Sequence, residues 1–245
     1  MLDNKTSSTS LSFIPNTLTT AGLICGLIAT VFAMQASKEF GGLRGYEWTW
    51  IFIGGALIFD YCDGFCARLL HAYSDLGKNL DSLSDLVSFG VAPSLMTYNI
   101  ILDYHPGWSF VTWLPLLIPV TGAFRLARFN IDPNQKTVFM GLPIPANAIF
   151  WIGFSPLLIQ QGEMPAWIAT FAILAVSFLM VSPMPMFSLK IQSLKPVADN
   201  ILRLILVGAT IALVLTLGIQ GLMWAIIVYL FLSFISFFIL IKEQQ

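Results

Sequence analysis

The sequence predicts an all-α, polytopic membrane protein, and its composition and hydropathy carry that prediction. Of the 245 residues, 57% are hydrophobic and only 10% are charged, whereas about 25% of residues are charged in a typical soluble domain. The mean hydropathy is +0.80, and apolar runs of about 20 residues, the length that crosses a bilayer, recur along the chain. Charges this sparse exclude soluble enzymes and disordered proteins. The net charge of −1 argues against a nucleic-acid partner, and the three cysteines do not form a disulfide framework.

About eight apolar segments are long enough to be predicted as membrane spans. The loops between them are short, so neighbouring helices should run antiparallel, and residues 13–245 should form a single transmembrane domain. Residues 1–12 are polar and are expected to be a cytoplasmic leader. The predicted spans are about 14–36, 48–70, 84–102, 110–129, 146–161, 165–182, 200–218 and 221–241.

The distribution of basic residues predicts the orientation, because Lys and Arg collect on the cytoplasmic side of a membrane. With the N-terminus inside, all of the 12 Lys and Arg residues except Lys38 and Arg44 fall on the inner side. Both termini are therefore expected to face the cytoplasm, with the chain integral to the cytoplasmic membrane.

Aspartates gather where the second and third predicted spans meet on the inner side. Asp60 and Asp63 are separated by three residues and Asp81 and Asp85 by four, so each pair shares one face of a helix. The segment at about residues 70–80 is predicted to be the turn between the two helices. Asp75 lacks this spacing and is interpreted as a solvated charge.

Four converging carboxylates at the membrane edge repel one another and need neutralisation. Two divalent cations supply the matching charge, and carboxylate oxygens favour Mg²⁺ or Mn²⁺, with Ca²⁺ as a further occupant. Two such ions hold a diphosphate and stabilise a phosphoryl displacement. The simpler alternative is that these acids are solvated charges at helix ends, but acids clustered at membrane depth are usually functional.

The aspartates belong to a longer pattern, D-x2-D-G-x2-A-R-x8-G-x3-D-x3-D, with no position missing. This pattern resembles the signature of the CDP-alcohol phosphotransferase family. The flanking runs LDSLSDLVSFGVAP, GAFRLARFN and GLPIPANA resemble the branch of that family that uses serine as acceptor. The pattern comprises Asp60, Asp63, Gly64, Ala67, Arg68, Gly77, Asp81 and Asp85.

The resemblance implies the family's helical membrane fold and a metal-dependent transfer of the phosphatidyl group from CDP-diacylglycerol to L-serine, with release of CMP. It implies that Asp60, Asp63, Asp81 and Asp85 ligate two cations and that Asp85 also accepts the proton. It further implies membrane-lipid partners and a homodimer. The residues that it assigns to CDP-diacylglycerol are Asn16, Thr19, Gly64, Ala67, Arg68, Ser74 and Gly77.

Two arginines near the end of the fourth predicted span are candidates for the acceptor site. Arg125 and Arg128 are three residues apart, so both can point to one side of the helix. Arginine binds carboxylates through two parallel hydrogen bonds, and serine carries a carboxylate that inositol and choline lack. The alternative is that both are inner-side anchors for lipid headgroups.

Two rival functions remain open. A sister enzyme of the same family would use glycerol 3-phosphate, inositol or choline in place of serine. A divalent-cation transporter would instead line a pathway with acids spread through the depth of the bilayer; here they concentrate at the inner ends of two helices.

Overall fold

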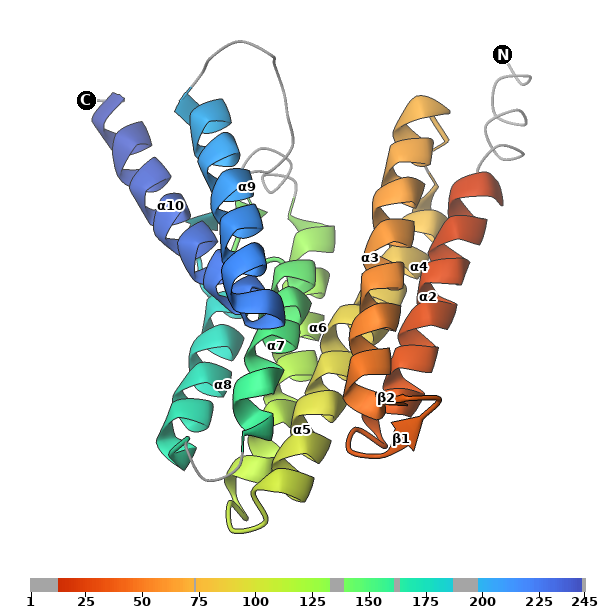
Figure 1. Ribbon diagram of the computed structural model, residues 1–245. Helices are drawn as coiled ribbons and strands as arrows, with labels where there is room; N and C mark the ends of the chain where they lie inside the picture. The colour runs from red at the N-terminus through yellow and green to blue at the C-terminus, as the bar shows by residue number, and fades with distance from the viewer. Residues whose placement is uncertain (1–12, 73, 133–138, 161–163, 187–197, 244–245) are drawn as a thin grey trace, which may run out of the picture. The chain divides into compact units, whose positions relative to one another are not determined.

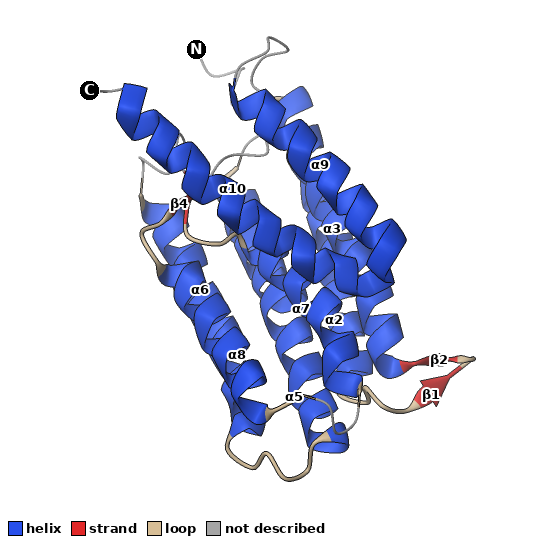
Figure 2. Ribbon diagram, turned by 60° about the vertical axis from the view of Figure 1, so that its left-hand side comes forward, coloured by secondary structure: helices blue, strands red, loops and turns tan. Residues whose placement is uncertain are grey.

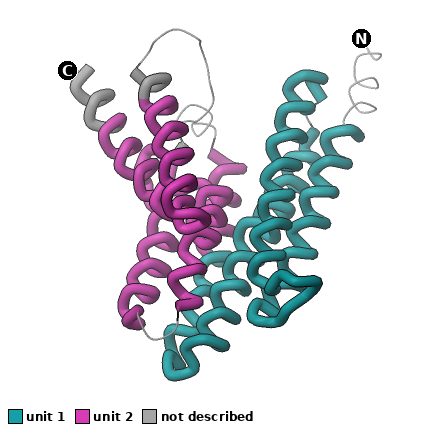
Figure 3. Tube along the Cα trace, in the orientation of Figure 1, with its two compact units in different colours: residues 1–120 teal, residues 121–245 magenta. Residues whose placement is uncertain are grey.

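The computed structural model describes residues 13–72, 74–132, 139–160, 164–186 and 198–243, and these are mostly helical (Figures 1 and 2). This agrees with the predicted all-α class, to which the structure adds two short two-stranded sheets, the hairpin of β1 with β2 and the pairing of β3 with the distant β4. The predicted cytoplasmic leader, residues 1–12, lies outside the described residues. The chain forms two compact units, Met1–Val120 and Thr121–Gln245 (Figure 3). The single catalytic domain expected from the sequence stays a prediction.

The first unit is built around helix α2, which packs against α3, α4, η1 and α5. Strands β1 and β2 form an antiparallel hairpin that pairs Glu39 with Arg44 (Figure 2). Segment η2 is a 3-10 helix containing Pro115, whose missing N–H weakens an α-helix. The bounds are α2 Phe13–Ala33, β1 Glu39–Phe40, β2 Leu43–Arg44, α3 Gly45–Leu69, α4 Asp75–Asp85, the π-helix η1 Leu86–Val91, α5 Ala92–Tyr104 and η2 Val111–Leu116.

Small residues on α2 bring its backbone close to the helices that carry the aspartates. A Cβ added at Gly22 would lie 3.3 Å from Phe59 Cβ of α3 and 3.8 Å from Ser84 Oγ of α4, and one added at Gly26 would lie 2.1 Å from Ser88 Oγ of η1, which continues α4. Side chains larger than glycine would push these helices apart. The close approach explains how α3 and α4 can both contact one face of α2.

In the second unit, α7 packs against α10, and α9 also packs against α10. A Cβ at Gly153 would lie 2.2 Å from the backbone nitrogen of Met223, so this contact also requires a glycine. Trp151 is fully buried and donates a hydrogen bond from Nε1 to Asn147 Oδ1 at 2.9 Å. The bounds are α6 Leu117–Ile131 (which begins in the first unit), β3 Phe139–Met140, α7 Ile144–Ile159, α8 Ala166–Val181, β4 Pro185–Met186, α9 Ala198–Leu217, the 3-10 helix η4 Gly218–Gln220 and α10 Gly221–Glu243.

Helices coincide with each of the apolar segments predicted as spans, although fewer meet the length and composition expected of a span. Within the described residues, four helical stretches are long and apolar enough to cross a bilayer: Phe13–Ala33, Gly45–Leu69, Asp75–Tyr104 and Leu202–Ser236. The apolar helices Ile144–Ile159 and Ala166–Val181 are shorter. The prediction of eight spans is therefore not confirmed by helix length.

The turn predicted at about 70–80 is wrong in its extent. Helix α4 already begins at Asp75, and Ser74 is its N-cap, with Oγ accepting a hydrogen bond from the backbone N–H of Gly77 at 3.0 Å. Serine is a preferred N-cap residue because its hydroxyl satisfies one of the first free N–H groups. Gly77 consequently lies in the first turn of α4 and not in the loop.

Candidate active site

Three of the four predicted carboxylates converge between α3 and α4. Asp60 and Asp63 of α3 and Asp81 of α4 each offer an oxygen, and these oxygens all lie within 4.8 Å of one another. Asp63 is the most buried, with 5% of its surface exposed. The spacing of three residues on α3 places Asp60 and Asp63 on one face, as the sequence predicts, and α4 brings Asp81 to the same place.

Helix α2 adds a hydroxyl to this group. Thr19 Oγ1 donates a hydrogen bond of 2.5 Å to Asp63 Oδ2, and Thr19 is itself buried. The backbone carbonyl of the same residue accepts a hydrogen bond of 3.4 Å from Ser84 Oγ of α4. Thr19 thus contacts both helices that supply the carboxylates.

Asp85 lies one turn beyond Asp81 and is outside the group of three. It is the last residue of α4, immediately before the π-helix η1. A π-helix turns by a smaller angle per residue than an α-helix and is frequent at functional sites. The structure therefore distinguishes Asp85 from the other three acids by its position.

The residues predicted for CDP-diacylglycerol lie on three elements of the first unit. Gly77 and Asn16 are in close approach, because a Cβ at Gly77 would lie 2.8 Å from Asn16 Oδ1. Gly64 has an open face, where the nearest neighbour of an added Cβ is Arg68 Nη1 at 3.8 Å. The hydroxyl oxygen of Ser74 caps α4, which leaves its proton available to a ligand.

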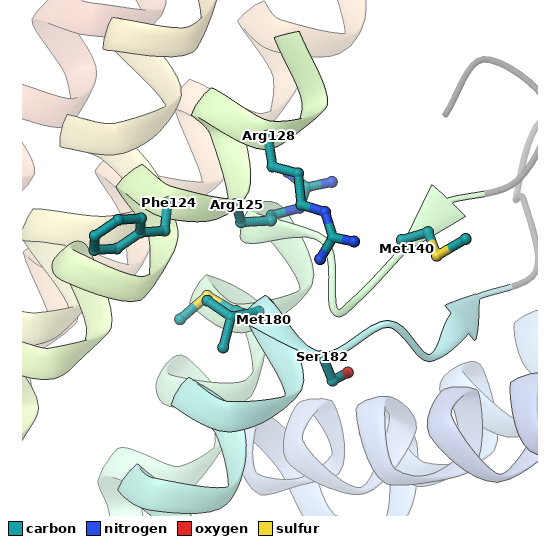
Figure 4. Close-up of a pocket in the computed structure, with 7 residues that line it drawn as sticks. Phe124, Arg125, Arg128, Met140, Met180 and Ser182 are labelled. Atoms are coloured by element: carbon teal, nitrogen blue, oxygen red, sulfur yellow. The ribbon is translucent and has the colours of Figure 1, made fainter. Parts of the chain in front are cut away.

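Arg125 and Arg128 line a pocket of about 260 Å³ within the second unit (Figure 4). Arg125 is buried and lies over the ring of Phe129, with Cζ 5.7 Å from the ring centroid, while Arg128 is exposed. The pocket is below the size of about 300–1,000 Å³ that suits a drug-sized ligand. Its other lining residues are Phe124, Met140, Met180, Val181 and Ser182.

The α8 side of this pocket was not predicted. Ser182 ends α8, and it follows Met180 and Val181 in the sequence. The signal that was available is the Pro-containing run SPMP at 182–185, which stops a helix and so marks a place where the chain turns. Sequence spacing alone does not predict that this turn lies next to α6.

Comparison with known proteins identifies the family. The chain matches the CDP-alcohol phosphatidyltransferase family over residues 12–183. The chain belongs to this family. A CDP-diacylglycerol–serine O-phosphatidyltransferase of Mycobacterium tuberculosis is 33% identical over 230 residues, which cover 89% of this chain and 76% of the relative.

Proteins of the same name from other organisms are also similar. The one from Bacillus subtilis is 33% identical over 156 residues, covering 62% of this chain and 82% of the relative. The one from Methanocaldococcus jannaschii is 44% identical over 103 residues, covering 42% of this chain and 48% of the relative. The resemblance predicted from the aspartate pattern is thereby confirmed.

The site of this CDP-alcohol phosphatidyltransferase fits the divalent cation for which the family is known. Its donors are all oxygens, from Asp60, Asp63 and Asp81, and hard cations such as Mg²⁺, Mn²⁺ and Ca²⁺ prefer oxygen ligands. The three carboxylates approach closely although Asp63 is buried, which is a costly arrangement of negative charge without a counter-ion. Together with the apolar helices, the family match makes the chain a membrane protein.

Proposed function

We propose that this protein transfers the phosphatidyl group of CDP-diacylglycerol to the hydroxyl of L-serine and releases phosphatidylserine and CMP. The observation that carries the proposal is the convergence of Asp60, Asp63 and Asp81 in a chain whose relatives bear the name of this activity. The carboxylates supply the ligands that a diphosphate-cleaving site needs.

In this proposal Asp60, Asp63, Asp81 and Asp85 hold two divalent cations, Mg²⁺ or Mn²⁺, with Ca²⁺ as another occupant. When bound, such cations neutralise the diphosphate and stabilise charge on the leaving oxygen. The carboxylates of α3 and α4 fix where the charge is neutralised, because they are attached to packed helices and not to a loop.

The CDP group is held by the first unit. Arg68 is exposed beside Gly64, and its guanidinium offers several donors to phosphate oxygens. Gly64 leaves open space that a bulkier residue would fill. The full set proposed for CDP-diacylglycerol is Asn16, Thr19, Gly64, Ala67, Arg68, Ser74 and Gly77.

Asp85 is the proposed proton acceptor. The serine hydroxyl is a weak nucleophile at neutral pH and needs a base in reach. As its oxygen forms a bond to the β-phosphorus that carries diacylglycerol, the proton passes to the Asp85 carboxylate. The bond from that phosphorus to the oxygen of CMP then breaks, and CMP leaves with the electron pair.

The acceptor is bound by Arg125 and Arg128. Their pocket has room for a small polar molecule and carries two guanidinium groups, which match the carboxylate of serine. Neither choline nor inositol carries an anionic group that these arginines could bind.

Arg125→Ala is expected to raise the KM for serine about tenfold or more while changing the KM for CDP-diacylglycerol much less. A hydrogen-bonded charged group contributes about 1.5–3 kcal/mol, and 1.4 kcal/mol corresponds to a factor of ten. Initial rates measured against each substrate in turn test this. Arg44→Ala is the matched control, since exposed Arg44 bonds Tyr104 in the first unit. Equal weakening of both substrates would contradict an acceptor role.

The proposal includes the topology of eight spans as one transmembrane catalytic domain in the cytoplasmic membrane. The positions of the helices support it, because a helix coincides with each apolar segment, and so does the bias of Lys and Arg. Both termini and the active site then face the cytoplasm, where serine and CDP are soluble. The chain is proposed to act as a homodimer.

An acceptor panel tests the function directly. The purified full chain is supplied with CDP-diacylglycerol, Mn²⁺ and, in separate reactions, serine, glycerol 3-phosphate, inositol or choline, and the release of CMP and the lipid product are measured. We expect phosphatidylserine alone. CMP release with another alcohol in place of serine would show that the protein is a sister enzyme with a different acceptor. Mn²⁺ flux into liposomes without CMP release would support a transporter.

A further inference from the structure

The contact between Thr19 and Asp63 has a role that the resemblance does not assign. Thr19 Oγ1 lies 2.5 Å from Asp63 Oδ2 and 3.0 Å from the carbonyl oxygen of Pro15. The hydroxyl has a single proton. Of the two possible acceptors, the Asp63 carboxylate is the stronger, because it is charged and lies closer. The Thr19 hydroxyl proton is therefore committed to Asp63, so Thr19 would contact CDP-diacylglycerol through its other atoms and not by donating this proton.

Both partners are almost completely buried, with 5% of each residue exposed. A water molecule cannot readily replace the threonine proton in such a place, because removing one buried partner leaves the other unsatisfied. The Asp63 carboxylate has about four acceptor positions, so one hydrogen bond on Oδ2 still leaves positions for a cation. The bond fixes the orientation of Asp63 without blocking it.

From this geometry we infer that Thr19 is a positioning residue for the cation site, which orients Asp63 toward the oxygens of Asp60 and Asp81. This inference rests on the proposed function, since it assumes that the three carboxylates hold a cation. Partners that hydrogen-bond a metal ligand typically contribute about tenfold to a hundredfold to metal affinity. Thr19 of α2 thereby orients a residue of α3, and the two residues are 44 positions apart in the chain.

The backbone of Thr19 strengthens the argument that the contact is a fixed one. Its carbonyl faces Ser84 Oγ at 3.4 Å, and Ser84 lies on α4 between Asp81 and Asp85. Three residues along, Gly22 allows α2 to lie against α3 at Phe59. The position of the Thr19 hydroxyl is thus set by packing against both ligand-bearing helices.

The test is a titration of the purified, detergent-solubilised full chain with Mn²⁺ in the absence of CDP-diacylglycerol, with free Mn²⁺ followed by electron paramagnetic resonance. Thr19→Val, which keeps the shape and removes the donor, is expected to weaken Mn²⁺ binding about tenfold or more. Thr19→Ala should do the same, and Thr19→Ser, which keeps the hydroxyl, should stay within about threefold of wild type.

Thr20→Val is the matched control, because Thr20 is exposed and its hydroxyl donates to the backbone carbonyl of Asn16 on the same helix. This variant should bind Mn²⁺ as the wild type does. Wild-type affinity in Thr19→Val would overturn the inference, and so would an equal loss in Thr19→Ser. If the Val and Ala variants fail to fold while Ser folds, the hydroxyl serves folding and the positioning role is refuted. A wild-type chain that binds no Mn²⁺ would instead refute the proposed cation site.

Discussion

Asp81→Asn is expected to reduce Mn²⁺ affinity on the order of a hundredfold and turnover on the order of a thousandfold, with little change in folding. A direct ligand should matter at least as much as the groups that orient it. A loss of several kcal/mol of charge stabilisation corresponds to that fall in rate. Asp81 is the residue through which α4 joins the two aspartates of α3, so its loss leaves only one helix supplying carboxylates to the group of three.

The matched control for this prediction is Asp75→Asn. Asp75 is on the same helix and is exposed in its first turn, but it has no place in the group of three. CMP release and Mn²⁺ titration on both variants separate a specific effect from a general change in charge. If Asp75→Asn and Asp81→Asn lose activity to the same extent, the convergence of the three carboxylates is not what supports turnover.

Much of this site follows from local rules. The three-residue spacing of Asp60 and Asp63 places both on one helix face whatever the tertiary structure, and the turn between two neighbouring helices predicts that Asp81 joins them. The helix positions followed from apolar runs, because the length of a bilayer-spanning segment is fixed by the membrane. The start of α4 was missed because Gly77 favoured a turn, whereas the Ser74 cap already began the helix.

The parts that sequence did not predict depend on contacts between distant segments. The hydrogen bond from Thr19 to Asp63 requires α2 to approach α3 closely, which the small residues on α2 permit. Nothing in the spacing of Thr19 specifies its partner. In the same way, Met180 and Ser182 line the arginine pocket only because the segment after α8 pairs with the one before α7, as β4 pairs with β3.

Asp85→Asn is expected to lower turnover about a hundredfold to ten-thousandfold, the usual contribution of a general base. Asparagine has nearly the same shape as aspartate, so the end of α4 should be preserved, but its amide cannot take up the serine proton. Single-turnover release of CMP measures the chemical step without interference from product release. The substitution removes the proton acceptor and leaves the group of Asp60, Asp63 and Asp81 intact.

Mn²⁺ titration of the same variant separates the two roles proposed for Asp85. Because Asp85 lies outside the group of three, Asp85→Asn should weaken Mn²⁺ binding less than Asp81→Asn, even though its turnover falls by a comparable factor. Asp85→Glu retains a carboxylate and should keep more activity than Asp85→Asn. Near-normal turnover in Asp85→Asn would refute the base assignment, whereas a loss of Mn²⁺ as large as that of Asp81→Asn would make Asp85 chiefly a ligand.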